Sequence, residues 1–242
     1  MNIEHLLLLD IETVPQQPDF HLLDEHWQQL WTEKAARYPS TADKPPETSY
    51  TERAAILAEF GKIICISTGY FYFNKHKHLC LHVHTLCGHN EKALLEQFLQ
   101  LTQQFNRKKK IFEFAGHNIK EFDIPYLCRR MTVHGLPIPG YLQLNGQKPW
   151  ETQIFDTLTW WKFGDYKNYI SLKLLTAVLG LPSAKEGMDG SMVQHVYYRE
   201  QDLSKIAAYC AGDVAAVAGI ILKFNNETAL QPANIITEFT TV

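Results

Sequence analysis

The most constraining feature of the chain is an apolar run near its start that ends in an acidic residue. Residues 5–10 read His-Leu-Leu-Leu-Leu-Asp. A short apolar run of this kind predicts a strand buried at the centre of a sheet. Because alternate residues of a strand share a face, Asp10 and Glu12 should point the same way while Ile11 enters the core. Taken alone, such a pair is more typical of a solvated strand end.

A second acidic motif, Asn-Ile-Lys-Glu-Phe-Asp, occupies residues 118–123. It follows another apolar strand, predicted over 111–115, and begins a predicted helix that carries Asp123. A simpler interpretation is that Asp123 caps this helix, with Pro125 tolerated in the first turn.

The third motif, Tyr-Cys-Ala-Gly-Asp at 209–213, lies in a long predicted helix over 203–224. Tyr209 and Asp213 are four residues apart and therefore share one helical face. On their own they could be a surface tyrosine and a solvated acid. The joint occurrence of the three motifs, each on a suitable element, favours a common centre.

Four carboxylates can hold two divalent cations. Two cations about 3.5–4 Å apart are the usual device for cleaving a phosphodiester. Hard cations such as Mg²⁺ or Mn²⁺ prefer carboxylate and water oxygens, so we expect one of these rather than zinc. The pattern therefore predicts a nuclease.

The motifs resemble those of the DEDD superfamily of 3′→5′ exonucleases, in its tyrosine-containing branch. The matching residues are, for the first motif, Asp10 and Glu12, for the second, Asn118, Phe122 and Asp123, and for the third, Tyr209 and Asp213. The chain is similar in particular to the proofreading exonuclease domain of family B DNA polymerases and to stand-alone bacterial proteins related to it. Residues 155–157 and 188–190 also resemble that group, and the likeness extends from about residue 6 to 224.

This resemblance implies a hydrolase that removes nucleoside monophosphates from the 3′ end of a single strand, with DNA favoured over RNA. One metal would be held by Asp10, Glu12 and Asp213, and a second by Asp10, with Asp123 contributing through water. Tyr209 would orient the attacking water. The expected substrate-binding residues are Thr13 through its backbone, His117, Asn118 and Phe122, with Lys120 and Lys173 as weaker candidates for phosphate contacts. His117 and Asn118 could instead orient Asp123. Phe122 could instead fill the core, and Asp156 is expected to be a structural acid.

The order of predicted elements is that of a ribonuclease-H-like α/β fold, a five-stranded mixed sheet flanked by helices. A helical insertion over about 15–60, with helices near 20–34 and 52–60 around a proline-containing loop, follows the first strand. It could be a lid over the site or an ornament on the sheet. Strands are expected over 62–73, 76–85 and 153–156, and helices over 91–105 and 171–179. We expect a single domain over 1–242 with a polar, loosely ordered tail from about 226.

Composition agrees with this interpretation. The 242 residues are 45% hydrophobic, which supports a large core, and the formal net charge is −3. A net negative charge is unusual for a non-specific duplex binder but is compatible with an enzyme that grips a few terminal nucleotides. Without a basic leader or an apolar run expected to span a membrane, we predict a cytoplasmic protein. The five cysteines lack CxxC spacing and are expected to be reduced core thiols.

Three further expectations concern single segments. Alternate histidines over 76–84 should form the polar face of an edge strand rather than a metal site. The basic run at 107–110 should end a helix, and Trp160 and Trp161 should pack against helices.

Two other functions remain open. An exoribonuclease of the same superfamily would carry the same acids, because the choice between DNA and RNA depends on contacts to the 2′ position. A non-catalytic nucleic-acid-binding protein is less compatible with four crowded carboxylates, whose repulsion costs stability. A polymerase or repair partner is conceivable, and the sequence does not identify one.

Overall fold

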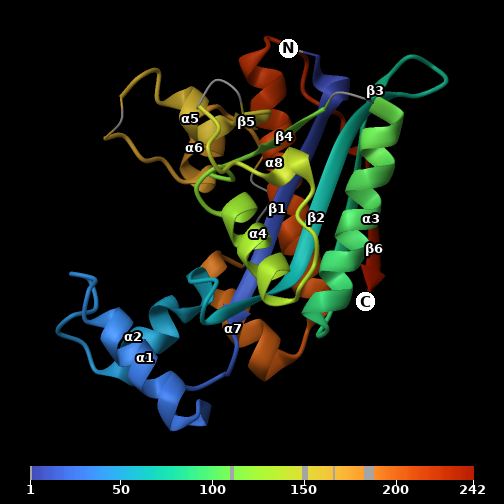
Figure 1. Ribbon diagram of the computed structural model, residues 1–242. Coiled ribbons are helices and arrows are strands. Elements are labelled where there is room, and N and C mark those ends of the chain that lie inside the picture. Colours follow the sequence, from blue (N-terminus) through green and yellow to red (C-terminus); the bar gives the residue numbers. More distant parts are fainter. Residues whose placement is uncertain (1, 110–111, 149–151, 166, 183–187) are drawn as a thin grey trace.

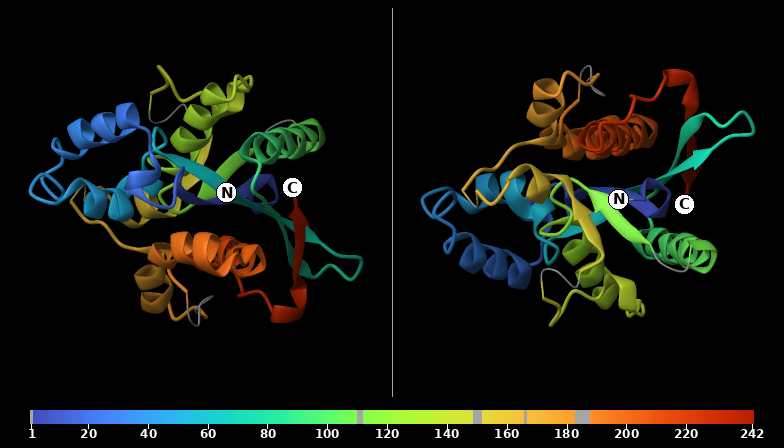
Figure 2. Two further views of the ribbon diagram at one scale, coloured as in Figure 1. Left: turned by 90° about the horizontal axis from the view of Figure 1, so that it is seen from below. Right: turned by 90° about the horizontal axis from the view of Figure 1, so that it is seen from above.

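The computed structural model describes residues 2–109, 112–148, 152–165, 167–182 and 188–242. Within these ranges the chain forms a six-stranded mixed sheet with helices on both faces (Figures 1 and 2). The predicted α/β class and mixed sheet are confirmed, with one strand more than the five expected.

The strands lie in the order β5-β4-β1-β2-β3-β6. They are β1 (Leu6–Pro15), β2 (Gly61–Phe73), β3 (Leu79–Cys87), β4 (Glu113–Gly116), β5 (Ile154–Asp156) and β6 (Ile235–Thr241). The pairs β1–β2 and β2–β3 are antiparallel, whereas β1–β4, β4–β5 and β3–β6 are parallel. The apolar run at the start of the chain is therefore a central strand, as predicted.

Helices form two layers around the sheet (Figure 2). Leu7, Leu9 and Ile11 face a core cluster that includes α3 and α4 residues, while Leu6 and Leu8 face α8. The helices are α1 (Glu25–Ala35), α2 (Pro46–Arg53), α3 (Glu91–Lys109), α4 (Asp123–Val133), α5 (Thr157–Trp161), α6 (Leu172–Val178), α7 (Val193–His195) and α8 (Leu203–Phe224), with the short turns η1 (Ile3–His5), η2 (Phe20–Leu22), η3 (Ala54–Ile56), η4 (Gly140–Leu142), η5 (Gly190–Met192), η6 (Val196–Glu200) and η7 (Pro232–Asn234).

The long helix α8 corrects one expectation. Its length and composition would allow it to cross a membrane, although we expected no such run. However, 67% of its most apolar window is buried inside the protein, and it contacts β1, β2 and β3. Packing on the sheet accounts for its apolar sequence.

The insertion after β1 has its own small core. Trp31, Tyr50 and Phe60 pack edge to face, with ring centroids 5.0–5.2 Å apart for the two pairs that include Trp31. The second helix begins at Pro46, earlier than predicted, because proline fits the first turn of a helix, where its missing N–H is not needed. Pro45 and Pro46 therefore lie at the start of this helix and not in a loop before it.

The hairpin between β2 and β3 also differs from the prediction. Its turn spans residues 74–78, so the strand begins at Leu79 instead of residue 76. His76 and His78 lie in the turn, while His82 and His84 face Glu238 and Thr240 of β6. β3 is thus not an edge strand, because β6 covers it.

The expectation of a loosely ordered tail is wrong for the end of the chain. Residues 235–241 pair with 81–87 of β3 in parallel register. The alternation in Ile-Ile-Thr-Glu-Phe-Thr-Thr is weak, and exposed edge strands of this kind carry little periodic signal. The partner strand decided the outcome.

The expectation that all cysteines are reduced is also wrong. Cys65 and Cys87 form a disulfide and occupy opposite positions in the β2–β3 ladder. Their Cα atoms are 4.2 Å apart. The pairing depends on the hairpin register, which the cysteine spacing alone does not reveal. Cys80, Cys128 and Cys210 are free thiols.

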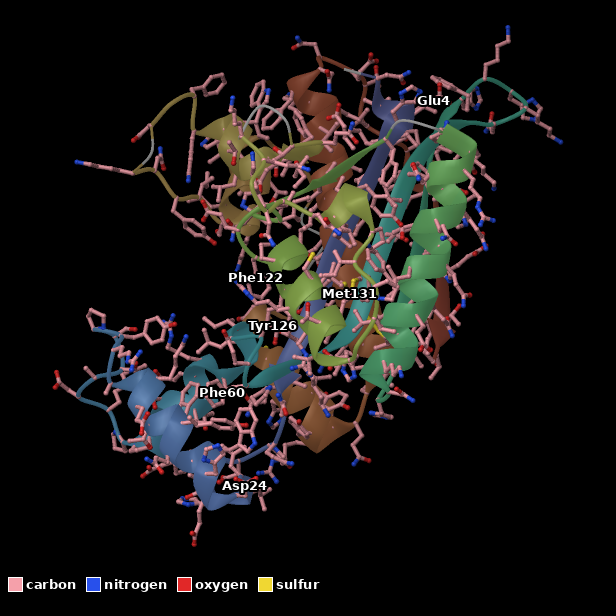
Figure 3. All side chains as sticks on the ribbon, in the orientation of Figure 1. Glu4, Asp24, Phe60, Phe122, Tyr126 and Met131 are labelled. Atoms are coloured by element: carbon pink, nitrogen blue, oxygen red, sulfur yellow. A yellow bond between two sulfur atoms is a disulfide. The ribbon has the colours of Figure 1, made fainter. Side chains whose placement is uncertain are left out.

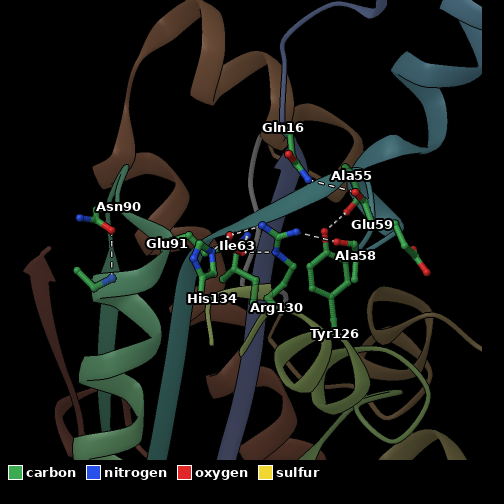
Figure 4. A network of polar contacts seen from close by, with 11 residues as sticks. Gln16, Ala55, Ala58, Glu59, Ile63, Asn90, Glu91, Tyr126, Arg130 and His134 are labelled. Carbon is green, nitrogen blue, oxygen red and sulfur yellow. Dashed lines mark hydrogen bonds and ion pairs between the residues drawn. The ribbon is translucent and has the colours of Figure 1, made fainter. Parts of the chain in front are cut away.

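A buried ion network fixes α4 against α3 and β2 (Figure 4). Glu91, at the start of α3, accepts hydrogen bonds from Arg130 at 2.6 and 2.9 Å, and its carboxylate lies 2.7 Å from His134 Nε2. It also accepts from the Ile63 backbone N–H at 2.7 Å. Arg130 donates further to the Ala58 carbonyl at the end of the insertion. The Glu91 carboxylate and the Arg130 guanidinium thus join α3, α4, β2 and the insertion, and these contacts hold α4 in place.

Most remaining elements lie where the sequence predicted them. The helix expected over 91–105 continues to Lys109, so the basic run ends it as expected, although Lys110 lies outside the described residues. The strand predicted over 111–115 is β4, and Ile111 likewise lies outside the described residues. The short helices α5 and α7 were not predicted.

Candidate active site

The first pair of acids lies in the middle of the sheet. Ile11 is 5% exposed in the core on the α4 side, and the Asp10 carboxylate faces α8, where Cys210 Sγ donates to Oδ2 at 3.2 Å. The register between β1 and β2 shifts immediately after Glu12. Such a bulge increases the local twist of a strand and re-aims its side chains. The alternation predicted from the sequence is confirmed, and the two acids share the α8 face.

The second motif joins this pair from the opposite layer. The chain leaves β4, which is parallel to β1, and turns through residues 117–122 before α4 begins at Asp123. Asp123 Oδ1 accepts a hydrogen bond from the Ile11 backbone N–H at 3.0 Å. No side chain caps α4, so the simpler interpretation of Asp123 as a helix cap is wrong. Its carboxylate instead accepts a hydrogen bond from the backbone of Ile11, the residue between Asp10 and Glu12.

The third motif approaches from α8. Asp213 is 8% exposed, and its charge acts on both Asp10 and Asp123. Tyr209, one turn earlier, is close enough to feel the charges of Glu12, Asp213 and Asp10. The predicted shared face of α8 is thus directed at the other acids.

The loop before α7 contributes to the same place. A Cβ atom on Gly190 would lie 3.8 Å from the Tyr209 hydroxyl, and the charge of Asp189 also acts on that hydroxyl. Residues 189 and 190 therefore lie next to Tyr209.

The electrostatics of the centre are those of crowded carboxylates. Burial, followed by the charges of Asp213, Glu12 and Asp123, raises the pKa of Asp10 well above its ordinary value. Burial also raises the pKa of Asp123 to about 7, with Asp156 and Asp213 adding to the rise, although the Ile11 hydrogen bond opposes it. These anions repel one another in the absence of a counter-charge.

The donor set fits hard divalent cations. Among the described residues, ligand atoms of Asp10, Glu12 and Cys210 all lie within 4.8 Å of one another. Burial and the charge of Asp10 raise the pKa of the Cys210 thiol well above its ordinary value, so the sulfur stays protonated and donates to Asp10. Carboxylate oxygens are therefore the available ligands, and such oxygens suit Mg²⁺ or Mn²⁺ better than softer metals.

Tyr209 remains a phenol in this environment. Burial, followed by the charges of Glu12, Asp213 and Asp10, raises the pKa of its hydroxyl well above the ordinary value of 10. A hydroxyl that keeps its proton can donate one hydrogen bond and accept others. It is thus suited to orienting a water rather than to removing a proton from it.

The predicted substrate-binding residues fall into two groups. His117 has both ring nitrogens engaged within the protein, at 2.9 Å from Thr157 Oγ1 and 2.9 Å from the Ile170 carbonyl. Burial lowers its pKa. This ring ties the second motif to the start of α6, and its contact with a nucleotide stays a prediction.

The other group consists of Thr13, which follows Glu12 in β1, and of Asn118 and Phe122, which belong to the turn before α4. The Thr13 side chain faces α4, where it hydrogen-bonds with Tyr126, so its backbone is the part next to the first motif. Asn118 has a left-handed backbone with φ of 63°. Phe122 is half-buried at the start of α4 and packs on Tyr126 at 5.4 Å between ring centroids (Figure 3). The core interpretation of Phe122 is supported, while one part of its ring stays accessible.

Asp156 is a structural acid, as expected. Its two carboxylate oxygens accept hydrogen bonds from the backbone N–H groups of Asn118 and Lys120, both at 3.0 Å. The same side chain caps α5 through Leu158 and Thr159. It therefore holds the turn that presents Asp123. An acid directly before Thr-Leu-Thr at the end of a strand was the sequence signal for this cap.

Trp160 and Trp161 pack as predicted. Both stack on Phe224 at the end of α8, and the centroids of Trp160 and Phe224 are 3.8 Å apart. The exposed aromatic residues that follow them, Phe163 and Tyr169, were not singled out from the sequence.

Comparisons with known proteins bear on the fold and the family of the chain. No curated protein matches the chain. The structure is similar to the family B DNA polymerase from the hyperthermophilic archaeon Pyrobaculum calidifontis, with a TM-score of 0.53 and 13% sequence identity. The match covers 91% of this chain and 24% of that polymerase chain, so this protein spans about a quarter of its length. At this identity the likeness establishes the fold, which is the ribonuclease-H-like fold expected.

A family model described as a predicted 3′-5′ exonuclease related to the exonuclease domain of PolB matches residues 56–240. The matched range contains Asp123, Tyr209 and Asp213, whereas Asp10 and Glu12 precede it. It comprises more than half of the chain. The protein therefore belongs to the family of predicted 3′-5′ exonucleases related to the exonuclease domain of PolB.

Proposed function

We propose that the protein is a metal-dependent 3′→5′ exonuclease that hydrolyses the terminal phosphodiester of single-stranded DNA and releases nucleoside 5′-monophosphates. The observation that carries this proposal is the hydrogen bond from the Ile11 N–H to Asp123, which brings a carboxylate from α4 to the strand that bears Asp10 and Glu12. Asp213 completes the set from α8. Three separate elements thus deliver acids to one point.

Two divalent cations, Mg²⁺ or Mn²⁺, would be held by Asp10, Glu12, Asp123 and Asp213. Such ions, when bound, lower the pKa of a coordinated water and stabilise the charge on a leaving oxygen. The distribution of the four acids between two ions follows the family resemblance: Asp10, Glu12 and Asp213 for one, and Asp10 with Asp123 for the other.

The remaining groups would orient the attacking water and the terminal nucleotide. The Tyr209 phenol, which is close enough to feel the charges of Glu12, Asp213 and Asp10, would hold the attacking water by a hydrogen bond. The backbone at Thr13 would meet the terminal sugar, and the half-exposed edge of Phe122 would contact its base. The insertion borders the side of α4 from which Phe122 and Tyr126 project (Figure 3), so it would limit the approach of substrate.

The test uses single-stranded DNA and RNA of one sequence, labelled at the 5′ end and incubated with Mg²⁺, Mn²⁺ or EDTA. We expect a metal-dependent ladder that shortens from the 3′ end, with DNA cleaved faster. The Asp10→Ala/Glu12→Ala variant should give no ladder. Glu96→Ala/Glu227→Ala, which removes two exposed acids away from the site, should cleave like the wild type.

Other outcomes separate the alternatives. Faster cleavage of RNA would identify an exoribonuclease. Binding of either strand without cleavage under any metal condition would favour a non-catalytic binding protein. If calorimetry finds that Asp10→Ala binds Mn²⁺ as tightly as the wild type does, the proposed metal centre is wrong.

A further inference from the structure

Exposed apolar side chains gather in α5, in α6 and in the segment that joins them. Of the 12 large hydrophobic side chains that are exposed among the described residues, five lie between residues 160 and 178. The two most exposed of these, Phe163 at 77% and Tyr169 at 68%, belong to the loop that joins α5 to α6. We call residues 162–165 and 167–171 the α5–α6 loop. Rings this exposed contribute little to the core, so they need another explanation.

The backbone holds Phe163 outward at a cost. Its φ is 45°, a left-handed value that a bulky residue rarely adopts, and Gly164 follows with φ of 90°. Conformations of this kind cost free energy and cluster at functional sites. The turn is further fixed by a hydrogen bond from the Asp165 N–H to the Lys162 carbonyl at 2.7 Å. The ring is therefore presented by an ordered turn.

The loop is attached directly to the second motif. The Ile170 carbonyl is 2.9 Å from His117 Nε2, and Tyr169 is the adjacent residue. At the other end, Trp160 stacks on Phe224, the last residue of α8. Asp213 lies eleven residues before Phe224 on the same helix, which corresponds to about 16 Å along its axis. The loop thus extends outward from the centre.

The charge of this region is opposite to that of the whole protein. Lys162 and Lys167 lie in the loop and Lys173 directly follows it, against the single acid Asp165. The whole chain carries a formal charge of −3. Exposed aromatic rings among lysines are the combination that binds single-stranded nucleic acid, because bases stack on the rings and ammonium groups meet the phosphates. Aromatic rings also occur at protein interfaces, but the lysines next to these rings favour an anionic strand with unpaired bases.

We propose that the α5–α6 loop is a platform for the part of a single-stranded DNA that precedes the terminal nucleotide. Bases stack on Tyr169 and Phe163, and Lys162 and Lys167 hold the backbone phosphates. The loop and the insertion project to the same side of the sheet, near opposite ends of α4 (Figure 1). This assignment rests on the proposed nuclease function and gives it a length requirement: longer strands bind better than a single nucleotide.

The test measures binding and catalysis separately. The anisotropy of fluorescein-labelled (dT)15 is followed with Ca²⁺ in place of Mg²⁺, for the wild type and for Phe163→Ala/Tyr169→Ala. Loss of two stacking contacts should weaken binding about 10-fold or more. Hydrolysis of the 4-nitrophenyl ester of thymidine 5′-phosphate, which contains one nucleotide, should change less than about two-fold.

Two further variants serve as controls. Phe73 is 54% exposed and precedes Lys75 and Lys77 in the β2–β3 turn, at a site far from the acids. Phe73→Ala should bind (dT)15 like the wild type. The Phe163→Tyr/Tyr169→Phe variant keeps both rings and should restore the wild-type affinity.

The outcomes are distinct. Unchanged affinity of Phe163→Ala/Tyr169→Ala, or an equal loss in Phe73→Ala, would overturn the platform, as would a parallel loss of ester hydrolysis. Tighter binding of (rU)15 than of (dT)15 through the same two rings would show that DNA is the wrong occupant. If the wild type binds (dT)15 through these rings but cleaves neither substrate, the platform stands and the proposed nuclease function fails.

Discussion

Replacing Asp123 by asparagine should stabilise the protein in the absence of divalent cations. Burial raises the pKa of Asp123 from 3.8 to about 7, so at pH 8 the folded state carries an anion that it holds unfavourably. A difference of this size corresponds to about 4 kcal/mol in the free energy of unfolding. The asparagine side-chain oxygen can still accept the hydrogen bond from the Ile11 N–H, so the substitution removes the charge and keeps the contact.

The effect of the charge on the free energy of unfolding should depend on pH. Because the pKa is higher in the folded state, ionisation opposes folding as the pH rises above about 4, and the penalty is complete above about 7. Asp123→Asn should therefore equal the wild type near pH 4 and exceed it by up to about 4 kcal/mol at pH 8. Urea unfolding in EDTA at several pH values measures this difference. Added Mg²⁺ should stabilise the wild type more than the variant.

The control is Asp43→Asn, which removes an exposed acid from the insertion and should leave the unfolding free energy within about 0.5 kcal/mol. An Asp123→Asn protein that is no more stable than the wild type at pH 8 in EDTA would refute the reasoning. A gain of equal size at pH 4 and pH 8 would also refute it, since the effect would then not come from the charge.

Three more predictions concern the site and the sheet. Asp156→Ala leaves the N–H groups of Asn118 and Lys120 without their acceptor, so it should lower the free energy of unfolding by about 3 kcal/mol in urea titrations and also lower kcat. Asp156→Asn should recover part of both quantities. A wild-type kcat in the alanine variant would contradict a positioning role. Tyr209→Phe should lower kcat in the labelled-strand assay by about 100-fold, and an unchanged kcat would exclude water orientation by its hydroxyl. Ending the chain at Leu230 removes β6 and its seven paired positions on β3, which should reduce the free energy of unfolding by about 3 kcal/mol or more. Cleavage at about room temperature should persist, because β6 lies at the edge of the sheet away from β4. Unchanged thermal unfolding would contradict the place of β6 in the sheet.

Local patterns in the sequence predicted a large part of this fold. The apolar run before Asp10, the two-residue spacing to Glu12 and the four-residue spacing from Tyr209 to Asp213 each follow from the geometry of a strand or a helix. The long helix over 203–224 was predicted at the bounds observed, because apolar residues at helical spacing over its 22 residues leave few alternatives to a helix. The candidate acids could therefore be named from the order and spacing of residues alone.

Features that depend on distant partners could not be predicted in this way. The tail becomes β6 only because β3 offers an unpaired edge, and Cys65 meets Cys87 only in the observed hairpin register. The turn at 74–78 is longer than expected, and its length sets the partner of every side chain on β3.

The same distinction holds for the site. The sequence by itself determined which acids are present and on which faces of their elements they lie, since period and spacing are local properties of the chain. Only the tertiary structure decided that Asp123 is bound at the Ile11 N–H, that Asp156 holds the turn before it, and that the rings of the α5–α6 loop stay exposed beside it. Each of these depends on contacts between residues far apart in the chain, whose formation is governed by the packing of the whole sheet and its two helical layers.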